Sequence, residues 1–337
     1  MMKFTKMHGC GNDYVFIFCF DEEVYDPEML SVRLSDRHTG IGSDGLVLIQ
    51  RSDTADAMMR MYNSDGSEGL MCGNAIRCVA KYLYDNKIVC KTAMRIGTMS
   101  GTRRLWLTIE GGAVASVKVD MGRAGLNPES IPVKLPGDSV IAQPVNISGI
   151  EYAITCVSMG NPHAVVFISN PGAGSGNRET TAANTSYNLD GSDKRSPDSL
   201  DSLDSPDIPD SLSSPNNSDN LDSPDSLDSL DGLDLHAIGP LFEFDSLFPD
   251  RVNVTFATAT GRNKLRARVW ERGSGETLAC GTGACAVAVA AVLNGLCDKG
   301  EDIEVNLPGG VLSIRYTDET VYLTGDCVKV FDGVVEI

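Results

Sequence analysis

The chain has 337 residues, of which 42% are hydrophobic and 6% aromatic, and it carries a formal net charge of −18. This length suits two domains of ordinary size, and the hydrophobic content is enough for their cores. Residues 178–234 alone hold 13 Asp and 1 Glu against 1 Lys and 2 Arg, a net of −11, so only −7 remains for the rest and a nucleic-acid-binding protein with a basic face is excluded.

The ten cysteines are scattered along the chain, and no apolar targeting region follows Lys3 and Lys6. The scattered cysteines and the lack of a targeting region predict a cytoplasmic protein with reduced thiols rather than a disulfide framework. The longest apolar run, 284–293, is too short to cross a membrane. There is no CxxC pair, so neither a zinc ribbon nor a thioredoxin-type site is supported, and no metal is expected.

The first part of the chain alternates strands with polar turns and two helices. Strands are predicted over 3–7, 14–20, 46–50 and 57–62, with the polar turn 8–13 between the first two. A helix is predicted over 26–37, with Pro27 in its first turn, and another over 75–84. The glycines at 40 and 42 lack a following Lys-Ser/Thr pair and a dinucleotide fingerprint, so nucleotide binding is rejected.

The predicted order of strands and polar turns then repeats. Alternating residues to about 120 predict hairpin-like strands, 126–136 reads as a crossover, and 151–169 reads as strand, polar turn, strand. The turn Gly160-Asn-Pro-His163 echoes Gly11-Asn12-Asp13, which indicates an internal duplication. Residues 170–230 hold a loose Asp-Ser-Leu repeat with almost no aromatic or β-branched residues, and are predicted to be a disordered surface insertion.

After the insertion the pattern is ordered again. A short helix is predicted over 234–242, and strands over 251–257 and 265–270. The run after Cys280 is apolar on every side and ends at Asn294-Gly295, which predicts a buried helix. The remaining residues alternate as strands to the end of the chain.

Two stretches, 62–75 and 270–283, share one sequence pattern. Aligned on Cys72 and Cys280 without a gap, each has an aromatic residue ten positions before the cysteine, a Glu four before, a Leu two before and a Gly directly after. Each copy reads as strand, Gly/Ser-rich loop, cysteine and helix, and Arg60 and Arg268 occupy matching places in the strands. Other cysteines, such as Cys78, Cys90 and Cys285, are expected to be ordinary buried residues.

The matched cysteines predict a chemistry that uses two equivalent thiols. A helix start offers free backbone N–H groups and partial positive charge, which favours a thiolate, lowers the cysteine pKa and binds a carboxylate. Two such starts facing each other would place the Cα of a bound amino acid between two sulfurs. One thiolate would remove the α-proton while the opposite thiol protonates the other face, a racemisation that needs no metal, pyridoxal phosphate or flavin. The pair would titrate as a coupled unit.

With these features the chain resembles the diaminopimelate epimerases. The matching pieces are HGCGNDY, NSDGSEGLMCGNAIRC, MGNPHAVVF, LFPDRVNVTF and RVWERGSGETLACGTGACA, which run through nearly the whole chain outside the insertion. Related proline racemases carry a His where this chain has Asn74. The resemblance implies an isomerase that converts LL-2,6-diaminopimelate to the meso form, before lysine and peptidoglycan precursor synthesis, with no cofactor.

The resemblance also implies a fold and a site. The fold is α+β, with two pseudo-symmetric domains, each a curved mixed β-sheet wrapped around a central helix, and the active site in the interdomain cleft. The domains are 1–122, completed by 327–337, and 123–326, interrupted at about 171–230. Cys72 and Cys280 are the catalytic acid/base pair, and His163 and Glu271 tune their pKa values. The implied substrate-binding residues are Asn12, Asn63, Gly73, Asn74, Asn161, Asn253, Glu271, Arg272, Gly281 and Thr282.

One position departs from the family and several alternatives stay open. Some relatives place a Gln where this chain has Gly45, so that contact is absent or replaced. The alternatives are a racemase for another amino acid such as proline, a cysteine hydrolase using Cys72 and His163, and a scaffold whose acidic repeat recruits partners. The expected partner is a small-molecule substrate, with neither nucleic acid nor membrane. The oligomeric state is open, with a homodimer as one option.

Overall fold

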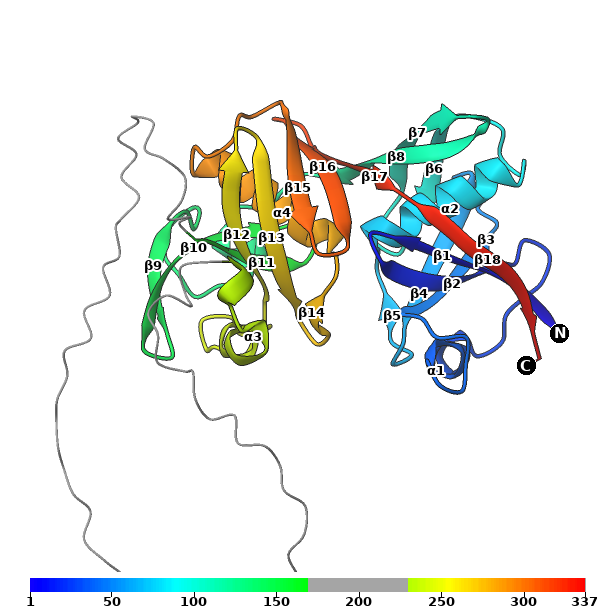
Figure 1. Cartoon of the computed structure of the whole chain (residues 1–337), viewed down its shortest axis with the longest axis horizontal. Coiled ribbons are helices and arrows are strands. Elements are labelled where there is room, and N and C mark those ends of the chain that lie inside the picture. The colour runs from blue at the N-terminus through cyan, green and yellow to red at the C-terminus, as the bar shows by residue number, and fades with distance from the viewer. Residues whose placement is uncertain (169–229, 337) are drawn as a thin grey trace, which may run out of the picture. The chain divides into compact units, whose positions relative to one another are not determined.

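The computed structural model describes residues 1–168 and 230–336. Residues 169–229, which include all but the last residue of the insertion that was predicted to be disordered, lie outside the described residues. The described chain forms one compact unit in which two lobes repeat the same order of strands and helices (Figure 1). We call the strands β1 to β8 together with β18 the N-terminal lobe, and the strands β9 to β17 the C-terminal lobe.

The N-terminal lobe is a mixed sheet. Its strands pair in the order β18-β1-β2-β3-β4-β6-β7-β8, with β2–β3 and β4–β6 parallel and the other pairs antiparallel, while the short β5 pairs with β4. The strands are β1 (Met2–Gly9), β2 (Asn12–Phe18), β3 (Gly45–Gln50), β4 (Ala57–Asn63), β5 (Glu68–Gly69), β6 (Ala93–Gly97), β7 (Arg103–Glu110), β8 (Ala113–Gly122) and β18 (Val328–Val335).

The C-terminal lobe repeats this topology strand for strand. Its order is β9-β10-β11-β12-β13-β15-β16-β17, with β11–β12 and β13–β15 parallel and the short β14 on β13. The strands are β9 (Gln143–Ile147), β10 (Ile150–Ser158), β11 (Pro162–Phe167), β12 (Asn253–Gly261), β13 (Lys264–Glu271), β14 (Gly275–Thr277), β15 (Asp302–Leu307), β16 (Gly310–Tyr316) and β17 (Val321–Asp326). The predicted internal duplication and the α+β class with pseudo-symmetric halves are confirmed.

One helix occupies the centre of each lobe, and a shorter one lies at its side. The central helices are α2 (Gly73–Asp85) and α4 (Gly281–Leu293), and the lateral ones are α1 (Pro27–Ser35) and α3 (Leu235–Glu243). The helix α4 is buried on nearly all sides, as its uninterrupted run of small apolar residues predicted. Asp26 caps α1 by accepting a hydrogen bond from the backbone of Met29. Two single 3-10 turns, η1 (Pro128–Ser130) and η3 (Leu230–Gly232), complete the helical elements within residues 1–168 and 230–336.

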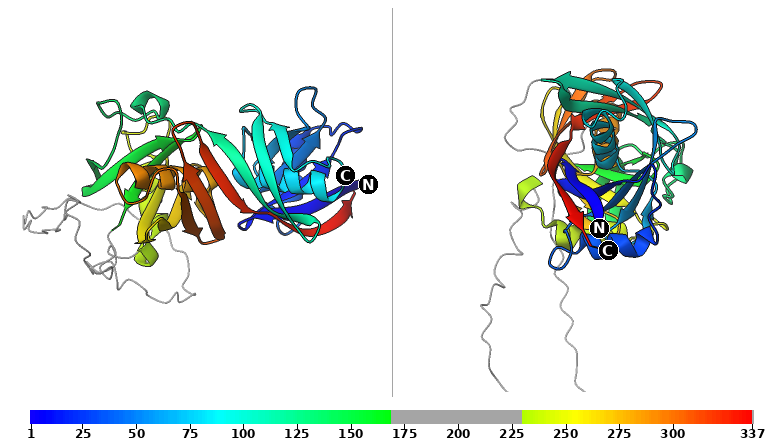
Figure 2. Two further views of the ribbon diagram at one scale, coloured as in Figure 1. Left: turned by 90° about the horizontal axis from the view of Figure 1, so that it is seen from above. Right: turned by 90° about the vertical axis from the view of Figure 1, so that its right-hand side faces the viewer.

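The two lobes are joined by strand pairing at β8 and β17, which run antiparallel. The last strand, β18, then returns to the N-terminal lobe and pairs with β1, where Thr5 donates a hydrogen bond of 2.7 Å to Asp332. This return, which the resemblance implies, pairs Val335 at the end of β18 with Met2 at the start of β1 (Figure 2). The domain boundaries at 122/123 and 326/327 stay a prediction.

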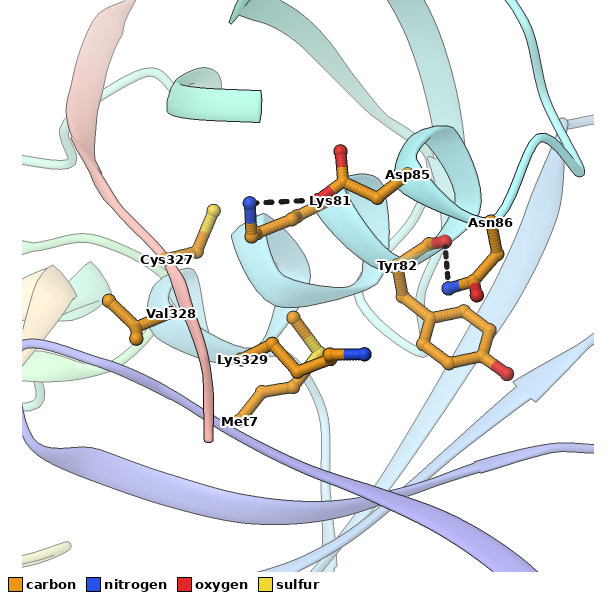
Figure 3. Close-up of a pocket in the computed structure, with 8 residues that line it drawn as sticks. All are labelled: Met7, Lys81, Tyr82, Asp85, Asn86, Cys327, Val328 and Lys329. Atoms are coloured by element: carbon orange, nitrogen blue, oxygen red, sulfur yellow. Dashed lines mark hydrogen bonds and ion pairs between the residues drawn. The ribbon is translucent and has the colours of Figure 1, made fainter. Parts of the chain in front are cut away.

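A hollow of about 480 Å³ lies beside the last turns of α2 in the N-terminal lobe (Figure 3). Lys81 and Asp85 form a 2.8 Å ion pair at its wall, and Asn86 donates to the carbonyl of Tyr82. Neither cysteine of the matched loops lines it, so its size does not make it the site of their chemistry. Among the described helices none is long and apolar enough to cross a membrane.

Candidate active site

Each matched cysteine is the N-cap of a central helix, as predicted. The Cys72 sulfur accepts a hydrogen bond from the backbone N–H of Ala75 at 3.5 Å, and the Cys280 sulfur accepts one from Gly283 at 3.3 Å. Both cysteines have extended backbone angles, which is the usual N-cap conformation. The local fold therefore places each sulfur at the positive end of a helix.

The loops that carry the cysteines are held by matched ion pairs. Arg60 bonds Glu68 at 2.7 Å between β4 and β5, and Arg268 bonds Glu276 at 2.8 Å between β13 and β14. Each pair closes a hairpin four residues before a cysteine. The matching places of the two arginines in the sequence thus correspond to matching structural roles.

The two helix starts are in contact. A methyl group added to Gly281 would lie 3.5 Å from the Cα of Gly73 and 3.3 Å from Leu323. The Asn74 side chain donates to the carbonyl of Ala279, the residue before Cys280, at 3.3 Å. The structure therefore brings the N-termini of α2 and α4 together, which is the arrangement that the two-thiol chemistry requires.

Asn12 lies at the centre of a hydrogen-bond network around Cys72. Its Oδ1 accepts from the Cys72 thiol at 3.5 Å and from Asn74 Nδ2 at 3.1 Å, and its Nδ2 donates to Asp44 at 2.8 Å. The hydroxyl of buried Tyr14 donates to the Cys72 sulfur at 3.8 Å. Tyr14 was predicted only as part of a strand. The alignment of the turn after Gly11 with the turn after Gly160, extended by one residue, would have found it, because Tyr14 aligns with His163.

The residues around Cys280 form the matching network. Thr282 Oγ1 lies 3.4 Å from the Cys280 sulfur and accepts from Asn161 Nδ2 at 3.2 Å. Asn161 Oδ1 lies 3.1 Å from His163 Nε2, so this histidine nitrogen carries the proton. Burial lowers the pKa of His163 to about 3, with the nearby charge of Arg272 acting in the same direction. The ring is therefore neutral, and its buried Nδ1 has no hydrogen-bond partner among the described residues.

Glu271 is the last residue of β13 and Arg272 follows it directly, and neighbouring residues hold both in place. Asn253 accepts from the Arg272 backbone at 2.9 Å and donates to the Pro162 carbonyl at 2.7 Å. The Arg272 guanidinium is exposed and donates to the Asp250 carbonyl at 2.7 Å. Glu271 accepts from the Thr277 hydroxyl at 2.5 Å and lies close enough to Cys280 to accept its thiol proton in a hydrogen bond.

Buried Glu243 on α3 is a supporting residue that the sequence analysis missed. It accepts from the Trp270 indole at 2.8 Å and from the Gly273 backbone at 3.0 Å. These two contacts hold both ends of the segment that carries Glu271 and Arg272. No local motif distinguishes this residue, and only an acid in the apolar run LFEF signals it.

Asn63, a predicted substrate-binding residue, and Gly45, the departure from the family, lie in surroundings that limit their roles. Asn63 is exposed and donates to the Ser67 hydroxyl within its own loop, so the structure does not bring it to either cysteine. At Gly45 an added Cβ would lie 2.1 Å from the Tyr62 carbonyl and 3.1 Å from the Tyr14 ring. No side chain, including the Gln of some relatives, fits at this position without a shift of the backbone.

The expected lowering of the thiol pKa values is wrong for this structure. Burial raises the pKa of Cys72, and it raises that of Cys280 well above the ordinary value of 9.0. The charge of Glu271 acts in the same direction on both thiols, and the helix N–H groups lower the values by less than burial raises them. Burial likewise raises the pKa of Glu271. Cys90 is exposed in the turn after α2, which corrects its expected burial, whereas Cys78 and Cys285 are buried as expected.

These directions predict how the free protein reacts with an alkylating agent. A thiol with a pKa above 9.0 is mostly neutral below that pH, so its alkylation rate rises about tenfold per pH unit from pH 6 to 9 with no plateau. The rates for Cys72 and Cys280 are read peptide by peptide with iodoacetamide and mass spectrometry. A midpoint below pH 8 for either cysteine in the ligand-free protein would contradict the assignment.

The fold and the paired cysteines define the class of protein to which the chain is similar. A hydroxyproline epimerase from Agrobacterium vitis superposes with a TM-score of 0.60 at 12% identity, covering 98% of this chain and 90% of that one. A PhzF-family phenazine biosynthesis protein from Bacillus anthracis gives a TM-score of 0.61 at 11% identity, covering 100% and 99%. The chain therefore has the fold of racemase- and PhzF-like proteins.

Sequence comparison identifies the family within this class. The model of the family described as diaminopimelate epimerase matches residues 4–126 and 223–330. A diaminopimelate epimerase of Acetivibrio thermocellus is 43% identical over 100% of this chain and 99% of its own length. One from Methanococcus maripaludis is 42% identical over the full length of both. The chain belongs to the diaminopimelate epimerase family, whose members are isomerases.

Proposed function

We propose that this protein interconverts LL-2,6-diaminopimelate and meso-2,6-diaminopimelate by proton transfer at Cα between two cysteines, without a cofactor. The observation that supports this most directly is the contact between two helix N-termini, each capped by a cysteine of a duplicated motif. Membership of the epimerase family supports the choice of substrate.

The reacting carboxylate binds at the paired helix starts. The backbone N–H groups of Gly73, Asn74, Gly281 and Thr282 lie in the first turns of α2 and α4, where they have no partner within the helix. They stabilise the negative charge that moves onto the carboxylate when Cα loses its proton. An anion bound there is favoured by both helix dipoles.

The proton steps balance within the pair. The thiolate of one cysteine takes the Cα proton, the electron pair of the C–H bond moves into the carboxylate system, and the thiol of the other cysteine protonates the opposite face of Cα. Glu271 is the group placed to hold the Cys280 proton when that thiolate forms, since it is hydrogen-bonded to the thiol and its pKa is raised by burial. Neutral His163 orients Asn161, and through it Thr282, beside Cys280.

The other end of the substrate is an amino acid as well. The guanidinium of Arg272 suits the distal carboxylate because its planar fork pairs with both oxygens. Glu271 accepts from a substrate ammonium, and side-chain amides bind the remaining polar groups. These amides are Asn12, Asn63, Asn161 and Asn253.

We also propose that the chain has two domains, one formed by 1–122 with 327–337 and the other by 123–326. The protein is further proposed to be cytoplasmic. All ten cysteines are free, which fits a reducing compartment. The insertion at 171–230 takes no part in this proposal.

Proton exchange in heavy water tests the function. Purified, reduced protein is incubated with LL-diaminopimelate without added cofactor, and deuterium at Cα is followed together with the meso product. Deuterium entering the product as it forms is the expected result. Exchange of proline but not of diaminopimelate would replace the proposed substrate, and exchange of neither would refute the function.

A further inference from the structure

Arg77 is a fully buried arginine on α2, one turn after Cys72. Its Nη1 donates to the Gly73 carbonyl at 2.9 Å, its Nη2 to Asn74 Oδ1 at 3.1 Å and its Nε to the Asp326 carbonyl at 3.0 Å. Its Nη2 also makes a longer contact of 4.0 Å with the Cys10 sulfur, and none of the four acceptors is a carboxylate. Burying a guanidinium without a hydrogen-bonded carboxylate is costly, so the position calls for an explanation.

The first contact acts on the group that binds the reacting carboxylate. The carbonyl of Gly73 and the N–H of Asn74 belong to the same peptide group. A charged donor on that carbonyl draws electron density from the peptide and makes the Asn74 N–H a stronger donor, which is the cooperative effect of linked hydrogen bonds.

The second contact fixes the direction of the Asn74 amide. Because Arg77 can only donate, Oδ1 of Asn74 must face it, and Nδ2 must face the other way. There it donates to Asn12 Oδ1 and to the Ala279 carbonyl beside Cys280. The same Asn12 oxygen accepts from the Cys72 thiol, so one guanidinium orients the network on both sides of the helix contact.

The helix α4 has no arginine at the matching position. In the alignment on Cys72 and Cys280, the position of Arg77 is occupied in α4 by Cys285, a buried thiol. The two half-sites therefore differ in charge at this matched position within their helices.

We propose that Arg77 is a positioning residue that polarises the Gly73–Asn74 peptide and orients the Asn74 amide, which makes the α2 start the stronger of the two carboxylate-binding helix ends. The inference rests on the proposed function for its kinetic consequence, and on the contacts alone for its effect on the peptide. Removing the guanidinium weakens stabilisation of charge in the transition state more than binding of the ground-state carboxylate.

The test compares Arg77→Met and Arg77→Lys with Cys285→Ala, the matched position in α4. For Arg77→Met, kcat is expected to fall about 10- to 100-fold while KM changes less than about threefold, since loss of a whole oxyanion donor costs about 100- to 1,000-fold. Arg77→Lys retains the charge and recovers part of kcat. Cys285→Ala stays within about threefold of the unmodified protein.

Nuclear magnetic resonance provides a readout that does not depend on activity. In Arg77→Met the Gly73 carbonyl carbon and the Asn74 amide proton are expected to move upfield, while those of Gly281 and Thr282 stay. Unchanged Gly73 and Asn74 resonances, or an unchanged kcat, in a folded variant would overturn the inference. If Arg77→Met does not fold, Arg77→Lys decides, with smaller shifts in the same direction. A protein without epimerase activity would refute the proposed function and leave the resonance test intact.

Discussion

Alanine in place of Cys72 or of Cys280 is expected to lower the rate of epimerisation by about 1,000-fold or more. In the proposed mechanism each cysteine is the proton donor or acceptor for one face of Cα, and general acid–base groups contribute about 100- to 10,000-fold each. Because the two act in one step, loss of either removes inversion. The rate of meso product formation from the LL-isomer, measured with each purified variant, gives the result.

The residual proton exchange of these variants carries a second expectation. A single remaining thiolate removes and returns the proton on one face, so any deuterium that enters the substrate does so without inversion. Cys90→Ala is the control, since this thiol is exposed and lies in the turn after α2. A Cys280→Ala variant that retained full activity would favour a one-cysteine chemistry and reject the two-base mechanism.

Replacement of Arg272 by Met is expected to raise KM for diaminopimelate about 10- to 100-fold while kcat falls much less. A hydrogen bond to a charged group is worth about 1.5–3 kcal/mol, and one made equally in ground and transition states appears in KM. The Arg272 backbone is held by Asn253, so the substitution leaves the loop anchored. Steady-state kinetics in both reaction directions measure the two constants.

Arg262→Met is the matched control for this substitution. Arg262 lies in the turn between β12 and β13 and forms an exposed ion pair with Asp298, and solvent screening makes such a pair contribute little. Its kinetic constants are expected to remain within about twofold of the unmodified protein. A KM that is unaltered in Arg272→Met would remove this guanidinium from the distal binding site.

The sequence predicts the local structure of the site well because short-range signals govern it. The N-cap cysteines, the glycine-rich loops and the apolar run of α4 are each encoded within about 15 residues, and all are where they were predicted. The duplication also predicts which strands and ion pairs match, since alignment on two cysteines places Arg60 with Arg268 and Glu68 with Glu276.

The features that were missed depend on contacts between distant segments. The sign of the thiol pKa shifts is set by burial, which no local motif reports, and it outweighs the helix N–H groups that the sequence does reveal. Arg77 looks like one polar residue on a helix until Asp326, 249 positions away, is found beside it. Glu243 likewise acquires its role only through Trp270 and Gly273.

The return of β18 to β1 has a consequence for the order in which the protein is made. The edge of β1 remains unpaired during synthesis until residues 328–335 have left the ribosome, since β18 is its partner on that side. The C-terminal lobe, by contrast, holds all of its strands between residues 143 and 326. A chain released before residue 328 would expose the backbone of β1 as an open strand edge, the kind of surface that pairs with other chains and aggregates.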